Sequence, residues 1–590
     1  MTDSIPARLL ERAARRPHLP AYHVREGGIW RATSYETYAD EMLRAARALV
    51  SLGFEPGQNV AILGFNRPEW TILDLATMAA GGAPAGIYTT CSPEEVQYII
   101  DHSESPIVLV ENEHQWEKVK AQRANLPGLR HVITMRGTKR IDDPMVMGWD
   151  AFLAKAADTP ESVVRERIAA LEPNALATMI YTSGTTGPPK GVMLSHANLT
   201  WTADVAVRLV DYRSSDCSLS YLPLSHIAEQ MFSLHGPITS GASIYFARSI
   251  DDVPEDLKEV QPTIFFGVPR IWEKFHAGVS AKLAQAEGPK AKIASWALDV
   301  GREAMAARAT GRKLGRRLRL KHRIADKVIY SKVKPAIGLG RARVCVTGAA
   351  PISREVLEFF AGLDLLVLEV YGQSEGTGPT SFNQPDQFRY GTVGPAIPGA
   401  QVRIAEDGEI LLKGPNVFLG YYKNEEATKE TLDDEGWLHS GDLGAFDGPF
   451  LKIVGRKKEI IITAGGKNIA PKNLEAAFKD SEFVNECVVI GDERKFLSAL
   501  VTLDPEAAER FAAAHGEDAS ALHESAAMRA ELQKHLDAMN AKFARVEQIK
   551  KFTVLPRNLT VEEGELTPTL KVKRRNVAKN WATTIDAMYA

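Results

Sequence analysis

Apolar residues recur along the chain in two alternating patterns. Short apolar runs at 60–63, 83–88 and 107–110 predict buried strands. The segments between them, 68–80 and 93–100, have helical periodicity, and Pro93 suits the first turn of the second helix. Strands that alternate with helices predict a parallel sheet covered on both faces. The same alternation returns later, with strands predicted at 243–246, 263–266, 344–346 and 365–370.

Near the N-terminus, the segment from Thr33 to Glu36 predicts a capping box at the start of a helix. The helix is expected to bury one apolar stripe and to end near Gly53. The stripe consists of Tyr38, Met42, Ala46 and Leu49.

The pattern changes at two points in the second half of the chain. From about residue 380, turns separate short strands, which predicts a β-rich subdomain at about 380–454. Beyond Gly455, helices and strands alternate again in a shorter segment. The sequence therefore predicts an α/β protein whose large N-terminal domain, residues 1–456, contains doubly wound sheets. A small α+β domain, residues 457–590, is expected to follow.

Composition narrows the class of protein. The chain has 590 residues, 45% hydrophobic and 25% charged, which is typical of a globular protein of more than one domain. A formal net charge of −3 gives no reason to expect nucleic-acid binding. No apolar run has the length of a signal peptide or a membrane span. A cytoplasmic location is expected, since the four cysteines are scattered without metal or disulfide spacing: Cys91, Cys217, Cys345 and Cys487.

One segment has a strong local charge. Between residues 308 and 334 the only acid is Asp326, and leucines and an isoleucine are interleaved with many cations. This pattern predicts a basic helix, either fully solvated or in peripheral contact with an anionic membrane or an acidic partner. The cations include Arg312, Lys313, Arg316, Arg317, Arg319, Lys321, Arg323, Lys327 and Lys332.

The stretch from Tyr181 to Gly191 joins two predicted strands and reads Tyr-Thr-Ser-Gly-Thr-Thr-Gly-Pro-Pro-Lys-Gly. Its glycines let backbone approach a ligand, and its hydroxyls, amides and lysine can bind phosphate oxygens. It differs from a Walker A loop, in which the lysine leads into a helix. A turn rich in small residues is the alternative. The predicted phosphate contacts are Thr182, Ser183, Gly184, Thr185, Thr186, Gly187 and Lys190.

Four further motifs carry chemistry that suits a nucleotide. Small residues after the strand at 344–346 would let a flat ring lie against backbone, and the motif at 371–375 follows the carboxyl end of another strand. There Tyr371 can stack on a base, Ser374 can donate to a phosphate, and Glu375 can bind Mg²⁺. Asp442 can accept two ribose hydroxyls, and Arg456 can reach ribose or phosphate. The predicted contacts are Gly348, Ala349, Ala350, Tyr371, Gly372, Gln373, Ser374, Asp442 and Arg456.

Taken in order, these motifs resemble those of the adenylate-forming superfamily of acyl-CoA synthetases, luciferases and peptide-synthetase adenylation domains. The resemblance extends over nearly the whole chain. The segments 220–226 and 267–273 are most similar to long-chain and bubblegum-type fatty acyl-CoA synthetases. The resemblance implies that Glu375 binds Mg²⁺, that the small C-terminal domain is mobile, and that Lys458 is its hinge.

The resemblance also implies the remaining catalytic residues. Thr186 acts in the phosphate loop, and His226 lies between the carboxylate and thiol sites. Lys571 matches the lysine of the adenylation step by register and is preferred to Lys573. The glycine usual before that lysine is replaced by Leu570.

The implied reaction activates a long-chain fatty acid with ATP and Mg²⁺, giving an acyl-adenylate and pyrophosphate, and transfers the acyl group to coenzyme A. Three alternatives remain open: transfer to a carrier protein, non-catalytic binding of an acyl group or nucleotide, and oxidative luciferase chemistry. CoA dependence and ATP–pyrophosphate exchange separate the first two from the implied reaction.

Overall fold

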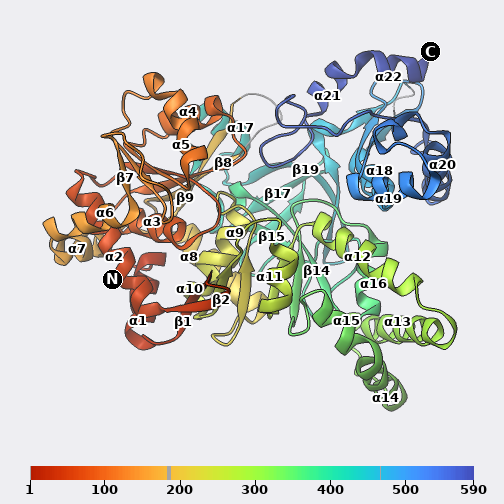
Figure 1. The fold of residues 1–590 in the computed structure, drawn as a ribbon, viewed down its shortest axis with the longest axis horizontal. Helices are drawn as coiled ribbons and strands as arrows, with labels where there is room; N and C mark the ends of the chain where they lie inside the picture. Colours follow the sequence, from red (N-terminus) through yellow and green to blue (C-terminus); the bar gives the residue numbers. More distant parts are fainter. Residues whose placement is uncertain (1, 183–187, 465–466) are drawn as a thin grey trace.

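The structure, a computed structural model, describes residues 2–182, 188–464 and 467–590. It contains a large N-terminal part and a separate C-terminal unit, coloured blue in Figure 1. The predicted α/β class and its division into a large and a small unit are confirmed.

The first sheet has eight strands in the order β18-β9-β8-β4-β3-β5-β6-β7. The strands from β4 to β7 in this order are parallel, whereas β8 pairs antiparallel with β9, and β9 with β18. Every residue of β3 and β4 is buried, as expected of strands covered on both faces. The bounds are β3 (Asn59–Leu63), β4 (Ala83–Ile87), β5 (Ile107–Val110), β6 (His131–Thr134), β7 (Val146–Gly148), β8 (Leu176–Thr182), β9 (Lys190–Ser195) and β18 (Gly420–Tyr421).

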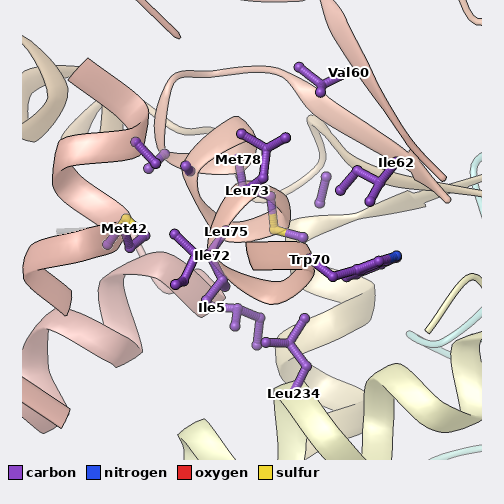
Figure 2. Close-up of a cluster of buried hydrophobic side chains, with 14 of the residues drawn as sticks. Ile5, Met42, Val60, Ile62, Trp70, Ile72, Leu73, Leu75, Met78 and Leu234 are labelled. Atoms are coloured by element: carbon purple, nitrogen blue, oxygen red, sulfur yellow. The ribbon is translucent and has the colours of Figure 1, made fainter. Parts of the chain in front are cut away.

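Helix α3 (Pro68–Ala79) forms the centre of the largest core, between α2 (Tyr35–Ser51) and β3. Figure 2 shows Ile72 of α3 next to Met42 of α2, while Trp70 points away from α2 on the other side of α3. The predicted stripe on α2 is buried, but the predicted capping box is wrong. The cap is Ser34 instead of Thr33, and its hydroxyl accepts from the amide of Thr37. Other helices of this part are α1 (Ile5–Arg15), α4 (Pro93–His102), α5 (Glu113–Ala121), α6 (Trp149–Ala154) and α7 (Glu161–Ala169).

Two four-stranded sheets follow in the N-terminal part. One has the order β10-β11-β1-β2 and the other β12-β13-β14-β15, in which β12, β13 and β14 are parallel. The carboxyl ends of β13 and β14 therefore lie at one edge, where ligands bind in such sheets. The bounds are β1 (Pro20–Glu26), β2 (Ile29–Ser34), β10 (Cys217–Ser220), β11 (Ser243–Phe246), β12 (Ile264–Gly267), β13 (Val344–Thr347), β14 (Val367–Gln373) and β15 (Gly378–Phe382).

The helices around these sheets include a π-helical turn at Met231–His235. The predicted basic helix is present but begins later than expected. Residues 310–315, around Gly311 and Gly315, are not helical and separate it from α13, and the helical run then continues from α14 through a π-helical turn at Asp326–Tyr330 into α15. The bounds are α8 (His196–Val210), α9 (Ile227–Gln230), α10 (Gly236–Ser240), α11 (Val253–Val260), α12 (Pro269–Ala284), α13 (Gly288–Ala309), α14 (Arg316–Ala325), α15 (Ser331–Ala336) and α16 (Arg354–Gly362).

An antiparallel sheet with the order β16-β17-β19-β20 connects the large part to the C-terminal unit. It is formed by β16 (Gln401–Ile404), β17 (Glu409–Lys413), β19 (Leu438–Asp447) and β20 (Phe450–Arg456), with α17 (Glu425–Thr431) before β19. Asp442 pairs with Arg456 across β19 and β20, at the point where the chain leaves this sheet.

The C-terminal unit has its own apolar core, in which helices pack on the sheet β23-β24-β25. Among the helices described, none is both long and apolar enough to cross a membrane. The bounds are β21 (Ile461–Ile462), β22 (Asn468–Ile469), β23 (Val484–Ile490), β24 (Leu497–Leu503), β25 (Ile549–Val554), α18 (Pro471–Phe478), α19 (Pro505–His515), α20 (Ala526–Asn540), α21 (Arg574–Asn580) and α22 (Ala582–Tyr589).

Candidate functional site

A cavity of about 2580 Å³ lies between the large part and the C-terminal unit. The structure brings every predicted site residue that it describes to the wall of this cavity, although the roles of these residues remain predictions. Ser183, Gly184, Thr185, Thr186 and Gly187 lie outside the described residues. The others are Thr182, Lys190, His226, Gly348, Ala349, Ala350, Tyr371, Gly372, Gln373, Ser374, Glu375, Asp442, Arg456, Lys458 and Lys571.

The predicted phosphate loop joins the antiparallel neighbours β8 and β9, which places both of its ends at the cavity wall. Thr182 pairs with Lys190 across the two strands. The ammonium group of Lys190 lies 4.7 Å from the ring centre of Tyr421 on β18. The aromatic face can attract this cation and so fix where its charge meets a ligand.

Tyr421 also touches Glu375, a contact that the sequence did not predict. Its hydroxyl donates to Glu375 Oε1 at 2.8 Å. Tyr421 therefore positions the predicted metal-binding carboxylate and the predicted phosphate-binding lysine together. The segment from Gly420 to Tyr422 has no periodic pattern that would predict this contact. Only the pairing of β18 with β9 in the structure reveals that Tyr421 lies beside the predicted phosphate loop.

The surroundings of Glu375 show whether this carboxylate could bind Mg²⁺. No hydrogen bond to Glu375 Oε2 is made by the described residues, so this oxygen is free to bind a cation. Within the same residues, no cluster of three or more His, Cys, Asp or Glu could hold a metal ion. A single carboxylate suits Mg²⁺, which usually keeps several waters and is also bound by substrate phosphates.

The motifs after β13 and β14 form a surface for a flat ring. Ala349 and Ala350 are exposed in the cavity, and Ala349 has a φ of +70°. Gly372 lies so close to the neighbouring strand that an added Cβ would be 1.7 Å from the carbonyl oxygen of Gly378. The backbone there cannot accept a side chain.

Asp442 is held by two partners. Tyr371 donates its hydroxyl to Oδ2 at 2.7 Å, and Arg456 Nε donates to Oδ1 at 3.2 Å. Asp442 is only 7% exposed. Burial raises the pKa of its carboxyl, and the nearby Arg456 cation opposes that rise. The pair is consistent with an anchor for ribose hydroxyls, because the carboxylate retains acceptor capacity beside its two partners.

Lys571 extends from the C-terminal unit into the same cavity. Its side chain keeps accessible surface because the cavity is wide, but the surrounding protein and the nearby cations Arg456 and Lys472 lower its pKa. The loop is closed by the Thr567 amide, which donates to the Lys571 carbonyl at 2.7 Å. Thr90, which the sequence did not single out, fixes the loop to the large part by donating to the Pro568 carbonyl at 2.5 Å.

Leu570 adopts the backbone conformation that a glycine would favour. Its φ is +59°, in the left-handed region, and its side chain is 62% exposed. A glycine would adopt this conformation without a steric penalty, whereas Leu570 adopts it at a cost in free energy.

His226 caps α9, and its Nδ1 accepts from the amide of Ala228 at 3.2 Å. Burial, with a smaller contribution from Lys571, lowers the pKa of His226 to about 4. The ring is therefore neutral near pH 7, and because Nδ1 is an acceptor, the proton is on Nε2. His226 can thus donate one hydrogen bond to a ligand oxygen.

One part of the cavity is apolar. Leu209 and Tyr212 at the end of α8, Phe232 in the π-helical turn and Phe266 on β12 line it. The rings of Phe232 and Phe266 stack at 4.8 Å. Such a pocket suits a hydrocarbon chain.

Comparisons with known proteins agree with the fold. Residues 9–422 match the family described as AMP-binding enzyme, and residues 458–590 match the AMP-binding enzyme C-terminal domain. The second match begins at the predicted hinge residue, Lys458.

Two curated relatives span most of this chain. A protein named long-chain-fatty-acid–CoA ligase ACSBG2, from Xenopus laevis, is 39% identical over 96% of the chain and 81% of its own length. A long-chain-fatty-acid–CoA ligase, FadD15, from Mycobacterium bovis is 36% identical over 100% of the chain and 97% of its own.

Solved structures share the fold at lower identity. The A-PCP didomain of a carboxylic acid reductase from Segniliparus rugosus, in complex with AMP, has a TM-score of 0.77 at 20% identity, covering 100% of this chain and 82% of its own. The anthranilate CoA ligase AuaEII, in complex with anthranoyl-AMP, has a TM-score of 0.74 at 19% identity, covering 99% and 98%.

The conformation of Leu570 leads to a test of stability. A left-handed φ costs an L-residue about 1–2 kcal/mol, and the exposed side chain loses little packing on removal. We expect Leu570→Gly to keep or raise the melting temperature in calorimetry. Leu320→Gly, at a similarly exposed helical leucine, should lower stability by about 1 kcal/mol. Equal losses in both variants would contradict the assigned conformation.

Proposed function

Since the chain belongs to the family of AMP-binding enzymes, we propose that it is a long-chain fatty acid–CoA ligase that forms AMP. The observation that best supports this proposal is the meeting of Lys571, Glu375 and Asp442 at one cavity that also has an apolar branch. The named function of relatives that match nearly all of the chain supports the same substrate class.

In the first step, a carboxylate oxygen of the fatty acid attacks the α-phosphorus of ATP, and the bond to the bridging oxygen of pyrophosphate breaks. Lys571 places a positive charge where the carboxylate and the α-phosphate meet, which stabilises the charge that develops there. Lys190 and the loop that it follows bind the outgoing phosphates. Asp442 accepts the ribose hydroxyls, and adenine lies against the cavity wall at Gly348 and Gly372.

Mg²⁺ would be held by Glu375 and would neutralise phosphate charge. His226, neutral with a proton on Nε2, orients the carboxylate oxygen instead of acting as a base, because a group with a pKa of about 4 is a weak base at neutral pH.

In the second step, the sulfur of coenzyme A attacks the acyl carbon, the thiol proton is lost to solvent, and AMP leaves. Lys571 has no role in this step. We propose that the unit beginning at Lys458 rotates to withdraw Lys571 and open the thiol site, as conformational steps do in many enzymes. The cytoplasm is the proposed location, supported by four buried cysteines without disulfides.

The apolar branch should set the preferred chain length. Ala206 on α8 lines the cavity, so Ala206→Phe should fill space that the distal end of the chain occupies. Each methylene that loses its burial costs about 0.8 kcal/mol, a drop of about fourfold in kcat/KM. We expect the optimum of CoA-dependent AMP release to move from long to shorter fatty acids. Arg208→Phe adds the same bulk at an exposed position and should leave the optimum in place. An unchanged profile in Ala206→Phe, or a wild-type optimum at acetate, would refute the assignment.

Lys571 and Lys458 are predicted to act in different half-reactions, so their variants should fail in different assays. Lys571→Ala should abolish adenylate formation, measured by ATP–pyrophosphate exchange, while still converting supplied acyl-adenylate and CoA to thioester. Lys458→Pro fixes φ and should spare exchange but slow thioester formation. Lys458→Ala, which keeps backbone freedom, is its control and should behave like the wild type. If Lys571→Ala and Lys458→Pro each lose both adenylate formation and thioester formation while circular dichroism is unchanged, the roles assigned to these two lysines are wrong.

The contact between Tyr421 and Glu375 predicts a specific defect. Tyr421→Phe removes one hydrogen bond to a carboxylate, worth about 1.5 kcal/mol, so exchange should fall about tenfold. The Mg²⁺ concentration for half-maximal exchange should also change, while the melting temperature stays close to that of the wild type. Tyr422→Phe is a matched control, because the Tyr422 hydroxyl donates to the exposed carboxylate of Glu104 at 3.0 Å. A Mg²⁺ dependence identical in all three proteins would count against this role for Tyr421.

A further inference from the structure

Helix α14 lies at the outer end of the helices that cover the β12–β15 region. In Figure 1 it is the lowest labelled helix, beyond α13 and α15 and far from the blue C-terminal unit. None of its residues lines the cavity. A function for this helix must therefore be sought on its own surface.

The inner face of α14 is packed against α13 and the neighbouring π-helical turn. Leu318 and Ala325 pack in a small core with Ala297 and Val300 of α13 and with Tyr330. His322 Nε2 lies 3.0 Å from Asp364, a carboxylate that also pairs with Lys334 at 2.9 Å and Arg308 at 3.0 Å. These nearby cations and the hydrogen bond from His322 lower the pKa of Asp364 to about 2 against the effect of burial. These contacts hold the inner face of α14 against the protein and leave its outer face exposed to solvent.

The outer face combines aliphatic and cationic side chains. Leu320 and Ile324 are one turn apart and are 61% and 48% exposed. At 100° per residue, they point to the side opposite Leu318 and Ala325. The exposed cations around them on this face are Arg316, Arg317 and Arg323, with Lys321 at its border.

These cations have no acidic partner within the described residues, in contrast to the ion-paired cations around Asp364. Arg319, by comparison, is turned back to donate to the Leu314 carbonyl at 3.1 Å. A helix that only had to remain solvated would need cations but not two exposed aliphatic side chains among them.

We propose that the outer face of α14 docks on the surface of an anionic lipid bilayer, with Leu320 and Ile324 in the headgroup region. Lipid phosphates and carboxylates match the unpaired cations, and aliphatic side chains flanked by Arg and Lys are typical of a helix that lies in a membrane interface. An acidic protein would attract the cations but would give Leu320 and Ile324 no apolar phase to enter. The docking is independent of the proposed catalytic activity.

The test measures binding of the full chain to vesicles without substrates. Wild-type protein should co-sediment with phosphatidylcholine–phosphatidylserine vesicles more than with phosphatidylcholine alone, and high salt should weaken binding. Arg316→Glu/Arg317→Glu should lower the partition coefficient by about fivefold or more for each cation replaced. Leu320→Ser/Ile324→Ser should lower it at unchanged charge. Both variants should keep wild-type CoA ligation of a water-soluble acid, which separates a docking defect from misfolding.

Lys139→Glu/Arg140→Glu is the matched control, since both residues are exposed and lack an ion pair among the residues described. It should bind vesicles as the wild type does. The proposal is overturned if the control loses as much binding as the α14 charge variant, or if vesicle type makes no difference. It is also overturned if Leu320→Ser/Ile324→Ser binds vesicles like the wild type. If polyglutamate then binds the wild-type protein and loses this binding in Arg316→Glu/Arg317→Glu, the surface serves an acidic protein partner instead.

Discussion

The ion pair between the buried carboxylate of Asp442 and the half-exposed guanidinium of Arg456 connects parts of this molecule that must act together. Asp442 is on β19, Arg456 ends β20, and Tyr371 ties the same carboxylate to the end of β14. A carboxylate this buried is tolerated because it is paired and hydrogen-bonded. The chain then passes directly into the C-terminal unit. One electrostatic contact thus fixes both the carboxylate proposed to bind the ribose and the point where the chain leaves the sheet.

Lys571 approaches this ion pair from the C-terminal unit, on the other side of the cavity. The lysine comes from a unit with its own core, yet it lies near Arg456, Asp442 and Glu375 in the cavity. Among like charges and out of bulk water, its cation is less stable than that of a free lysine. The cationic form is therefore favoured most when an anionic ligand is present. The hydrogen bond from Thr90 to Pro568 helps to hold the loop in this less favourable environment.

Local signals in the sequence predicted the strands and which residues would lie at the cavity wall. Apolar runs such as 107–110 coincide with β5, and the residues after β13 and β14 meet at the cavity because parallel strands end at one edge. Contacts between strands that are far apart in the chain could not be predicted. Tyr421 acts through the pairing of β18 with β9, which joins residues far apart in the chain. The start of the basic helix was predicted too early because charge periodicity says nothing about the break around Gly311 and Gly315. The cap at Ser34 differs by one residue from the pattern that predicted it.

The close approach of Gly372 to the carbonyl of Gly378 limits how this site can be redesigned. Engineers who alter nucleotide preference usually change side chains around the base. On the strand proposed to lie beside the base, Gly372 admits no side chain, because any Cβ would overlap backbone that cannot move without separating β14 from β15. The exposed Ala349 and Ala350 provide the other wall, where larger side chains have room. Changes of nucleotide preference would therefore have to start from that wall, while the strand opposite stays unchanged.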